Sequence, residues 1–185
     1  FVMHFVFIEN SINFTSSSLK FKAIDSFQKT LIHFSKELAR RKHKVTVYNN
    51  TAVNKHEEGI EWINLSQISN QSIDIDVLII CNDVDYLDIR INAKLKFFWI
   101  NSNIRLDDYK NILINLIKNK FIILYNLENL VSNLPHNFKY VPKIRFQVGI
   151  CSDFFENKNY NINNCNALVT AHPLRGLDWL LDIWI

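Results

Sequence analysis

Short apolar runs alternate with amphipathic segments along most of this 185-residue chain. The apolar runs predict strands at residues 2–8, 44–48, 59–65, 76–81, 95–100, 121–125 and 138–141. Apolar positions at helical spacing predict helices between them, at residues 24–38, 84–92, 107–118 and 128–133. Several strands are apolar almost throughout, as parallel strands covered on both faces are. The alternation predicts an α/β fold, a Rossmann-like three-layer αβα arrangement around a mainly parallel sheet.

The polar, Asn-rich segment 157–166 predicts a linker. Residues 1–156 then form an N-terminal domain, and residues 167–185 form the first strand and helix of an incomplete second domain. A turn with Pro173 and Gly176 precedes this last helix, and its apolar positions recur at i, i+3, i+4 and i+7: Leu177, Leu180, Leu181 and Trp184. Because the chain begins without methionine and ends inside this pattern, we expect that it is truncated.

Composition excludes several classes of protein. A net charge of +3, spread along the chain, does not indicate nucleic-acid binding. Cys81, Cys151 and Cys165 lack CxxC spacing and fit reduced cytosolic thiols. No apolar run approaches the roughly 20 residues of a membrane span. We therefore expect a cytoplasmic protein, with at most a weak attraction to the inner face of an anionic membrane.

Familiar catalytic motifs are missing from the sequence. It contains no GxGxxG or Walker loop, which argues against a nicotinamide enzyme or a P-loop NTPase. It contains no HExxH pair of metal-binding histidines and no GxSxG nucleophile elbow. Any chemistry must therefore come from less specific patterns.

Arg175 and Gly176 stand where the last helix is expected to begin. Unpaired backbone N–H groups and the positive end of the helix dipole favour an anion there. A guanidinium beside them would add a two-pronged phosphate contact. From spacing alone, a plain strand–helix corner with Arg175 in solvent explains the pattern better.

Two stretches resemble family 4 glycosyltransferases, which have the two-domain GT-B fold. Residues 172–184 are similar to the opening of their nucleotide-binding domain, and residues 38–48 to their first crossover, with Lys42 in place of the usual Gly. The resemblance implies transfer of a sugar from a nucleotide-sugar co-substrate to a glycan or lipid-linked acceptor, without a metal. It also implies that Arg175, with Gly176, contacts the diphosphate.

The same resemblance assigns the acceptor side to two loops. Where the family often has a Gly-Gly pair, this chain has Thr15-Ser16-Ser17-Ser18, so Ser16 and Ser17 would bond the acceptor or the sugar. A flexible surface loop explains this stretch equally well. Asn101 replaces a family histidine. An amide does not titrate, so acid–base catalysis by Asn101 is excluded, whereas a hydrogen bond to a sugar hydroxyl or a plain turn is not.

Asp83 and Asp85 form an Asp-x-Asp pair after the predicted strand 76–81. Clustered carboxylates suit a divalent cation, which makes a metal-dependent transferase one alternative function. Carboxylates also cap helix N-termini, and we favour that interpretation. Asp74 and Asp76 precede the strand and lie at the wrong end of the sheet.

The chain also departs from the family. Family 4 enzymes carry two glutamates eight positions apart in the second domain, and no pair here has that separation. We therefore expect the chain to be an inactive fragment of a glycosyltransferase. The alternative is a non-catalytic Rossmann-like interaction domain in which Arg175 is merely exposed.

Overall fold

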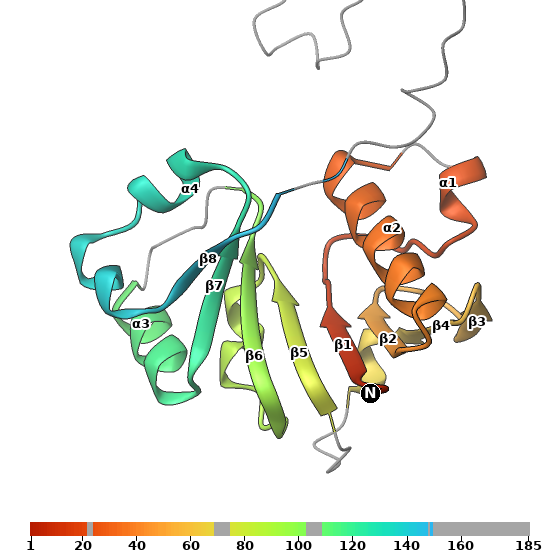
Figure 1. The fold of residues 1–185 in the computed structure, drawn as a ribbon, viewed down its shortest axis with the longest axis horizontal. Helices are drawn as coiled ribbons and strands as arrows, with labels where there is room; N and C mark the ends of the chain where they lie inside the picture. Colours follow the sequence, from red (N-terminus) through yellow and green to blue (C-terminus); the bar gives the residue numbers. More distant parts are fainter. Residues whose placement is uncertain (22–23, 69–74, 103–108, 148, 150–185) are drawn as a thin grey trace, which may run out of the picture. The chain divides into compact units, whose positions relative to one another are not determined.

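The computed structural model describes residues 1–21, 24–68, 75–102, 109–147 and 149. The chain divides into a unit at Phe1–Val148 and a second unit at Gly149–Ile185. The first unit contains an eight-stranded sheet with the order β3-β4-β2-β1-β5-β6-β7-β8 (Figure 1). The strands are β1 (His4–Ile8), β2 (Lys44–Asn49), β3 (Lys55–Glu57), β4 (Ile60–Asn64), β5 (Ile75–Cys81), β6 (Ala93–Ile100), β7 (Phe121–Tyr125) and β8 (Lys143–Arg145). The predicted α/β, Rossmann-like fold is confirmed.

Every neighbouring pair of strands is parallel except β3 and β4. β1 lies inside the sheet, where Phe7 is in register with Val47 of β2 on one side and with Ile79 of β5 on the other. The prediction that residues 2–8, 44–48, 76–81, 95–100 and 121–125 share one parallel sheet is therefore confirmed.

One face of the sheet is covered by α2 (Ser26–Arg40). The helix starts with a capping box, in which the Asp25 carboxylate accepts from the Gln28 backbone N–H at 2.9 Å and the Gln28 side chain accepts from the Asp25 backbone N–H at 3.1 Å. Its apolar side chains, among them Leu31 and Ile32, pack against Phe7 and other sheet residues on this face. Burial of these apolar side chains holds α2 over β1 and β2.

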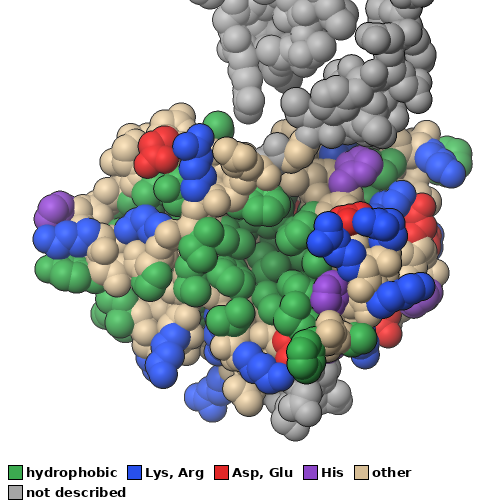
Figure 2. Space-filling view, in the orientation of Figure 1, with side chains coloured by type: hydrophobic (Ala, Val, Ile, Leu, Met, Phe, Trp, Pro, Cys, Tyr) green, Lys and Arg blue, Asp and Glu red, His purple; other side chains and the backbone are tan. Residues whose placement is uncertain are grey.

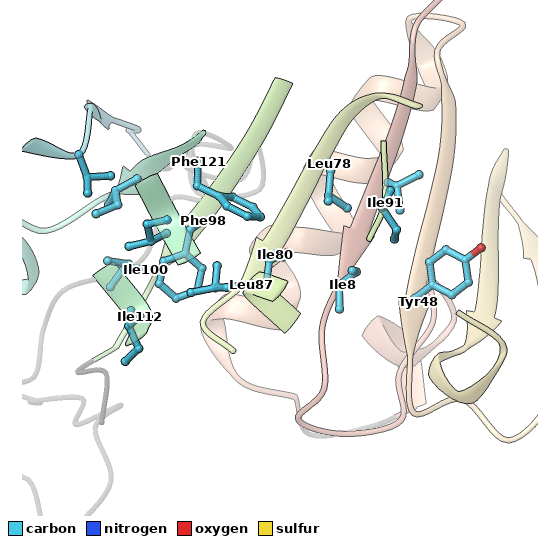
Figure 3. Close-up of a cluster of buried hydrophobic side chains, with 14 of the residues drawn as sticks. Ile8, Tyr48, Leu78, Ile80, Leu87, Ile91, Phe98, Ile100, Ile112 and Phe121 are labelled. Atoms are coloured by element: carbon cyan, nitrogen blue, oxygen red, sulfur yellow. The ribbon is translucent and has the colours of Figure 1, made fainter. Parts of the chain in front are cut away.

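The opposite face is covered by η2 (Val84–Asp88), α3 (Tyr109–Lys118), α4 (Glu128–Ser132) and η3 (His136–Tyr140). Ile8, Ile80 and Phe98 of the sheet lie under Leu87 and Ile112 of these segments (Figure 3). The two buried clusters thus form the layers of a three-layer fold.

Helix α2 ends in a left-handed residue. Lys42 has φ of 68°, its N–H donates to Ala39 O at 2.9 Å, and the N–H of His43 donates to Leu38 O at 3.1 Å. This pair of bonds is the Schellman arrangement, in which glycine usually takes the position of Lys42. Lys42 therefore adopts a left-handed conformation that glycine usually takes at the end of a helix.

Two sequence-based predictions need correction, and two strands were missed. The strand predicted at residues 138–141 is wrong, because Pro135 is the N-cap of the 3₁₀ helix η3 and Phe138 donates its N–H to Pro135 O at 2.9 Å. The helix predicted at 84–92 is the shorter 3₁₀ helix η2. The missed strands β3 and β8 are three residues long and carry little apolar pattern.

On the α2 side, Trp99 of β6 packs against Phe27 and Phe34 of α2, with ring centroids 4.9 and 6.2 Å apart, but the described residues cover the side chains farther from α2 only in part. Leu95 and Ile144 are each 48% exposed there, and Phe97 and Leu124 are half-buried. Figure 2 shows hydrophobic side chains gathered at the centre of this face. A pocket of about 180 Å³ lies among them, lined by Phe34, Ile79, Phe97, Trp99, Leu124 and Phe146.

The helices of the described ranges include no candidate for a membrane span. The predicted linker 157–166 and the start of a second domain at 167–185 lie outside the described residues.

Candidate ligand site at the carboxyl end of the sheet

The chain continues from β1 to β2, which pairs with one edge of β1, whereas β5 pairs with the other edge. The strand order therefore changes direction at β1. Ligands of open parallel sheets bind beyond the carboxyl ends of the strands, near such a change of direction. The residues that follow β1, β2, β5 and β6 at this edge are therefore the candidates for a site.

Asn10 links three of these loops. Its side-chain amide donates to Asp83 Oδ2 at 3.0 Å, which ties the loop after β1 to the loop after β5. Asn50, after β2, donates from Nδ2 to the backbone oxygen of Asn10 at 2.9 Å. The carboxyl edge is thus held by hydrogen bonds between short loops.

Glu9 is the first residue after β1, and its side chain is only 4% exposed. Oε1 accepts from the backbone N–H of Ser11 at 3.2 Å and from the Ser11 hydroxyl. Oε2 is buried and has no hydrogen-bond partner among the described residues. Burial raises the pKa of the Glu9 carboxyl above its ordinary value of 4.5, against the opposing effect of the Ser11 hydrogen bonds.

A pocket of about 290 Å³ opens beside the loops after β1 and β2. Its lining combines hydroxyl and amide groups with apolar side chains, from Asn13, Thr15, Ser17, Ser18, Phe21, Thr51, Ala52, Val53 and Lys55. Phe21, at the end of α1 (Ser18–Phe21), is 82% exposed, and Val53 is 66% exposed. The pocket therefore offers neutral hydrogen-bonding groups next to an exposed aromatic ring.

Local hydrogen bonds fix the hydroxyl wall of this pocket. Ser18 Oγ accepts from the backbone N–H of Thr15 at 2.9 Å, and the hydroxyls of Thr15 and Ser17 lie 2.9 Å apart. Glu57 Oε2 accepts from the Ser17 backbone N–H at 3.1 Å. Burial raises the pKa of Glu57, but the bonds from Ser17 and Thr15 and the nearby Lys55 outweigh it, so the pKa is lowered.

Asn49 positions both loops of the pocket. Its side chain is fully buried at the end of β2, and its amide donates to Phe14 O at 2.6 Å. Its Oδ1 accepts from the backbone N–H of Thr51 at 2.9 Å. One buried amide therefore sets the spacing of the two pocket walls.

Asn82 organises the edge between β5 and β6. It has φ of 53°, a left-handed conformation that asparagine tolerates better than most residues. Its Nδ2 donates to Ser102 Oγ at 2.7 Å, and its Oδ1 accepts from the backbone N–H groups of Asn101 and Ser102, both at 3.3 Å. Asn101 is half-buried within this turn.

Asp83 is the N-cap of η2 and accepts from the backbone N–H of Asp85 at 3.0 Å, so the capping interpretation is confirmed. Asp76 lies at the amino end of β5, where its carboxylate accepts from the His4 N–H at 2.7 Å and pairs with Lys94 at 2.6 Å. No group of three His, Cys, Asp or Glu side chains that could hold a metal gathers within the described ranges.

The predicted site residues take different places. Ser17 lines the pocket, whereas Ser16 is buried and its hydroxyl has no partner among the described residues. Asn101 belongs to another part of the same edge, because β5 separates β6 from β1. Arg175 and Gly176 lie outside the described residues.

Sequence reasoning missed three contributors to this edge: Glu9, Asn49 and Phe21. A signal exists for two of them, because Glu9 and Asn49 each follow an apolar run directly and so had to fall at a carboxyl end. Phe21 gave no signal, since an exposed phenylalanine and a buried one look alike in sequence.

Comparisons with known proteins identify no relative. No protein-family model matches the chain, and neither a curated protein nor a solved structure resembles it significantly.

Proposed function

We propose that the chain is the acceptor-side domain of a GT-B-type glycosyltransferase, which transfers a sugar from a nucleotide-sugar to a glycan or lipid-linked acceptor. The Rossmann-like sheet supplies the frame, and its carboxyl edge supplies the site. Arg175 and Gly176 keep their proposed role at the diphosphate.

The pocket beside Ser17 is the observation that carries this proposal. Its polar lining is mostly uncharged, with Thr15, Ser17 and Thr51 among the hydroxyl-bearing residues. Hydroxyls and amides both donate and accept hydrogen bonds, as sugar hydroxyls require. The exposed ring of Phe21 offers an apolar surface on which the C–H face of a sugar ring can pack.

Calorimetry of the chain with neutral oligosaccharides, among them maltose, cellobiose and mannobiose, tests the proposal. We expect at least one to bind, and we expect Phe21→Ala to weaken that binding about fivefold, or by about 1 kcal/mol. Tyr140→Ala is the matched control, because Tyr140 is 71% exposed on η3, away from the pocket residues. Equal loss in both variants, or no binding of any saccharide, contradicts the proposal.

A second candidate function is a non-catalytic interaction domain. The exposed Leu95 and Ile144 on the α2 side of the sheet favour it, because apolar patches on a protein surface mark association sites. The simplest form is association between copies of the chain. Sedimentation of the chain and of Ile144→Lys tests this: concentration-dependent association that the variant abolishes supports it, and a monomer at all concentrations contradicts it.

A further inference from the structure

The pocket of about 290 Å³ beside Ser17, the Ser17 pocket, has a polar wall that the chain's own hydrogen bonds largely occupy. Ser18 Oγ accepts from the Thr15 backbone N–H at 2.9 Å, and Thr51 Oγ1 donates to Val53 O at 3.0 Å. Thr15, Ser18 and Thr51 are 5%, 5% and 2% exposed. These three hydroxyl-bearing residues therefore offer a ligand little surface.

Most of the lining that stays accessible is apolar. Phe21, at the end of α1, is 82% exposed, and Val53, in the loop after β2, is 66% exposed. Ala52, next to Val53, is exposed as well and also lines the pocket. Apolar side chains gathered at an open pocket with a polar surround are typical of a ligand-binding groove. The rim of the Ser17 pocket therefore favours an apolar group in the ligand.

The polar part of the accessible lining is small and carries little net charge. Lys55 is the one charged residue of this lining, and its Nζ lies 3.5 Å from Glu57 Oε1, which offsets its charge. Asn13 is exposed and Ser17 is half-buried. An amide and a hydroxyl both suit the hydroxyl groups of an uncharged ligand. The polar part of the ligand is therefore small and neutral.

We propose that the Ser17 pocket binds an amphiphile: one uncharged sugar ring beside Asn13 and Ser17, with an aliphatic chain on its anomeric oxygen that lies along Phe21 and Val53. This inference rests on the proposed function and selects its lipid-linked acceptor over a free glycan. Further sugar rings would bring hydroxyls to the apolar rim, where they lose water without gaining hydrogen bonds. An aliphatic chain gains by leaving water there.

Calorimetry of the whole chain with the methyl and hexyl glycosides of glucose and of mannose tests the inference, below the concentration at which the hexyl glycosides aggregate. A fully buried methylene contributes about fourfold in affinity. Because a chain on an open rim keeps one side in water, we expect about twofold per methylene, or about 30-fold for the five that distinguish hexyl from methyl. Binding of a sugar without any gain from the hexyl chain overturns the inference and leaves the proposed function standing. If neither glycosides nor oligosaccharides bind, both are overturned.

Three variants locate the chain. Val53→Ser should lower the affinity for the hexyl glycoside about fivefold and leave that for the methyl glycoside within about twofold. Val2→Ser is the matched control, because Val2 is 73% exposed ahead of the amino end of β1. Ile144→Ser reports on the other exposed apolar surface, on the α2 side of the sheet. An unchanged gain from the hexyl chain in Val53→Ser, or a gain lost in Ile144→Ser, overturns the inference.

Discussion

The side-chain amide of Asn10 donates a hydrogen bond of 3.0 Å to the carboxylate of Asp83, between the loops that follow the neighbouring strands β1 and β5. The two residues are 73 positions apart in the sequence. Their contact joins the loops at which the strand order changes direction, and Asp83 also caps η2. At the edge that we propose as a ligand site, this contact therefore also stabilises the fold.

Asp83→Ala should lower the free energy of unfolding by about 1–2 kcal/mol, because it removes a helix cap and the partner of Asn10. Urea denaturation measures this. Asp85→Ala is the control. Asp85 is exposed and only follows the cap, so its loss should change stability by less than about 0.5 kcal/mol. Equal losses of stability in the two variants would contradict the stabilising role of the contacts that Asp83 makes.

Glu9 should make stability depend on pH. Its pKa is raised in the folded state, so the folded chain binds more protons than the unfolded chain above the ordinary pKa of 4.5. Stability from this group is therefore fully present below pH 4.5 and is lost as pH rises through the folded-state pKa. In thermal unfolding, the melting temperature of Glu9→Gln should increase relative to that of the original chain as pH rises through this window. Parallel profiles would show that the carboxyl is not perturbed.

Asn49→Ala should cost about 2 kcal/mol, because Phe14 O and the Thr51 N–H lose their buried partner. Asn49→Asp should not restore the stability, since a carboxylate cannot donate to Phe14 O. Chemical denaturation of both variants measures this, with the exposed Asn129→Ala as control. If Asn49→Asp were as stable as the unmodified chain, the Asn49 amide would not be needed to hold the two pocket walls.

Lys42→Gly should raise the free energy of unfolding by about 0.5–1 kcal/mol, because glycine adopts the left-handed conformation of this residue without strain. The same substitution at Lys29, exposed within α2, should instead lower it by about 1 kcal/mol. Denaturant midpoints give both values. A loss of stability in Lys42→Gly would mean that the lysine side chain makes a contribution larger than the strain.

Much of the fold was predictable because the central strands are apolar and the long helices are amphipathic. Residues 76–81 and 121–125 carry that pattern strongly, and they form β5 and β7. The prediction failed at Phe138, where one apolar residue serves equally well in a strand or in a 3₁₀ turn after Pro135. Strand β3 was not predicted because its residues, Lys55, His56 and Glu57, are all polar.

The site was less predictable because its geometry depends on contacts between distant loops. Ser17 could be placed at the edge from its position after the first strand. The pairing of Asn10 with Asp83 spans 73 positions, and no local pattern indicates it. Likewise, the sequence does not show that Ser11 occupies only one oxygen of Glu9.

Mapping of backbone amide shifts during titration with a neutral oligosaccharide tests the central claim most directly. We predict that the shifts gather at residues 13–21 and 51–55, around the pocket, with smaller ones at 82 and 101–102. Shifts confined to β6, β7 and β8 on the α2 side, or no shift at any sugar concentration, would contradict a sugar site at the carboxyl edge.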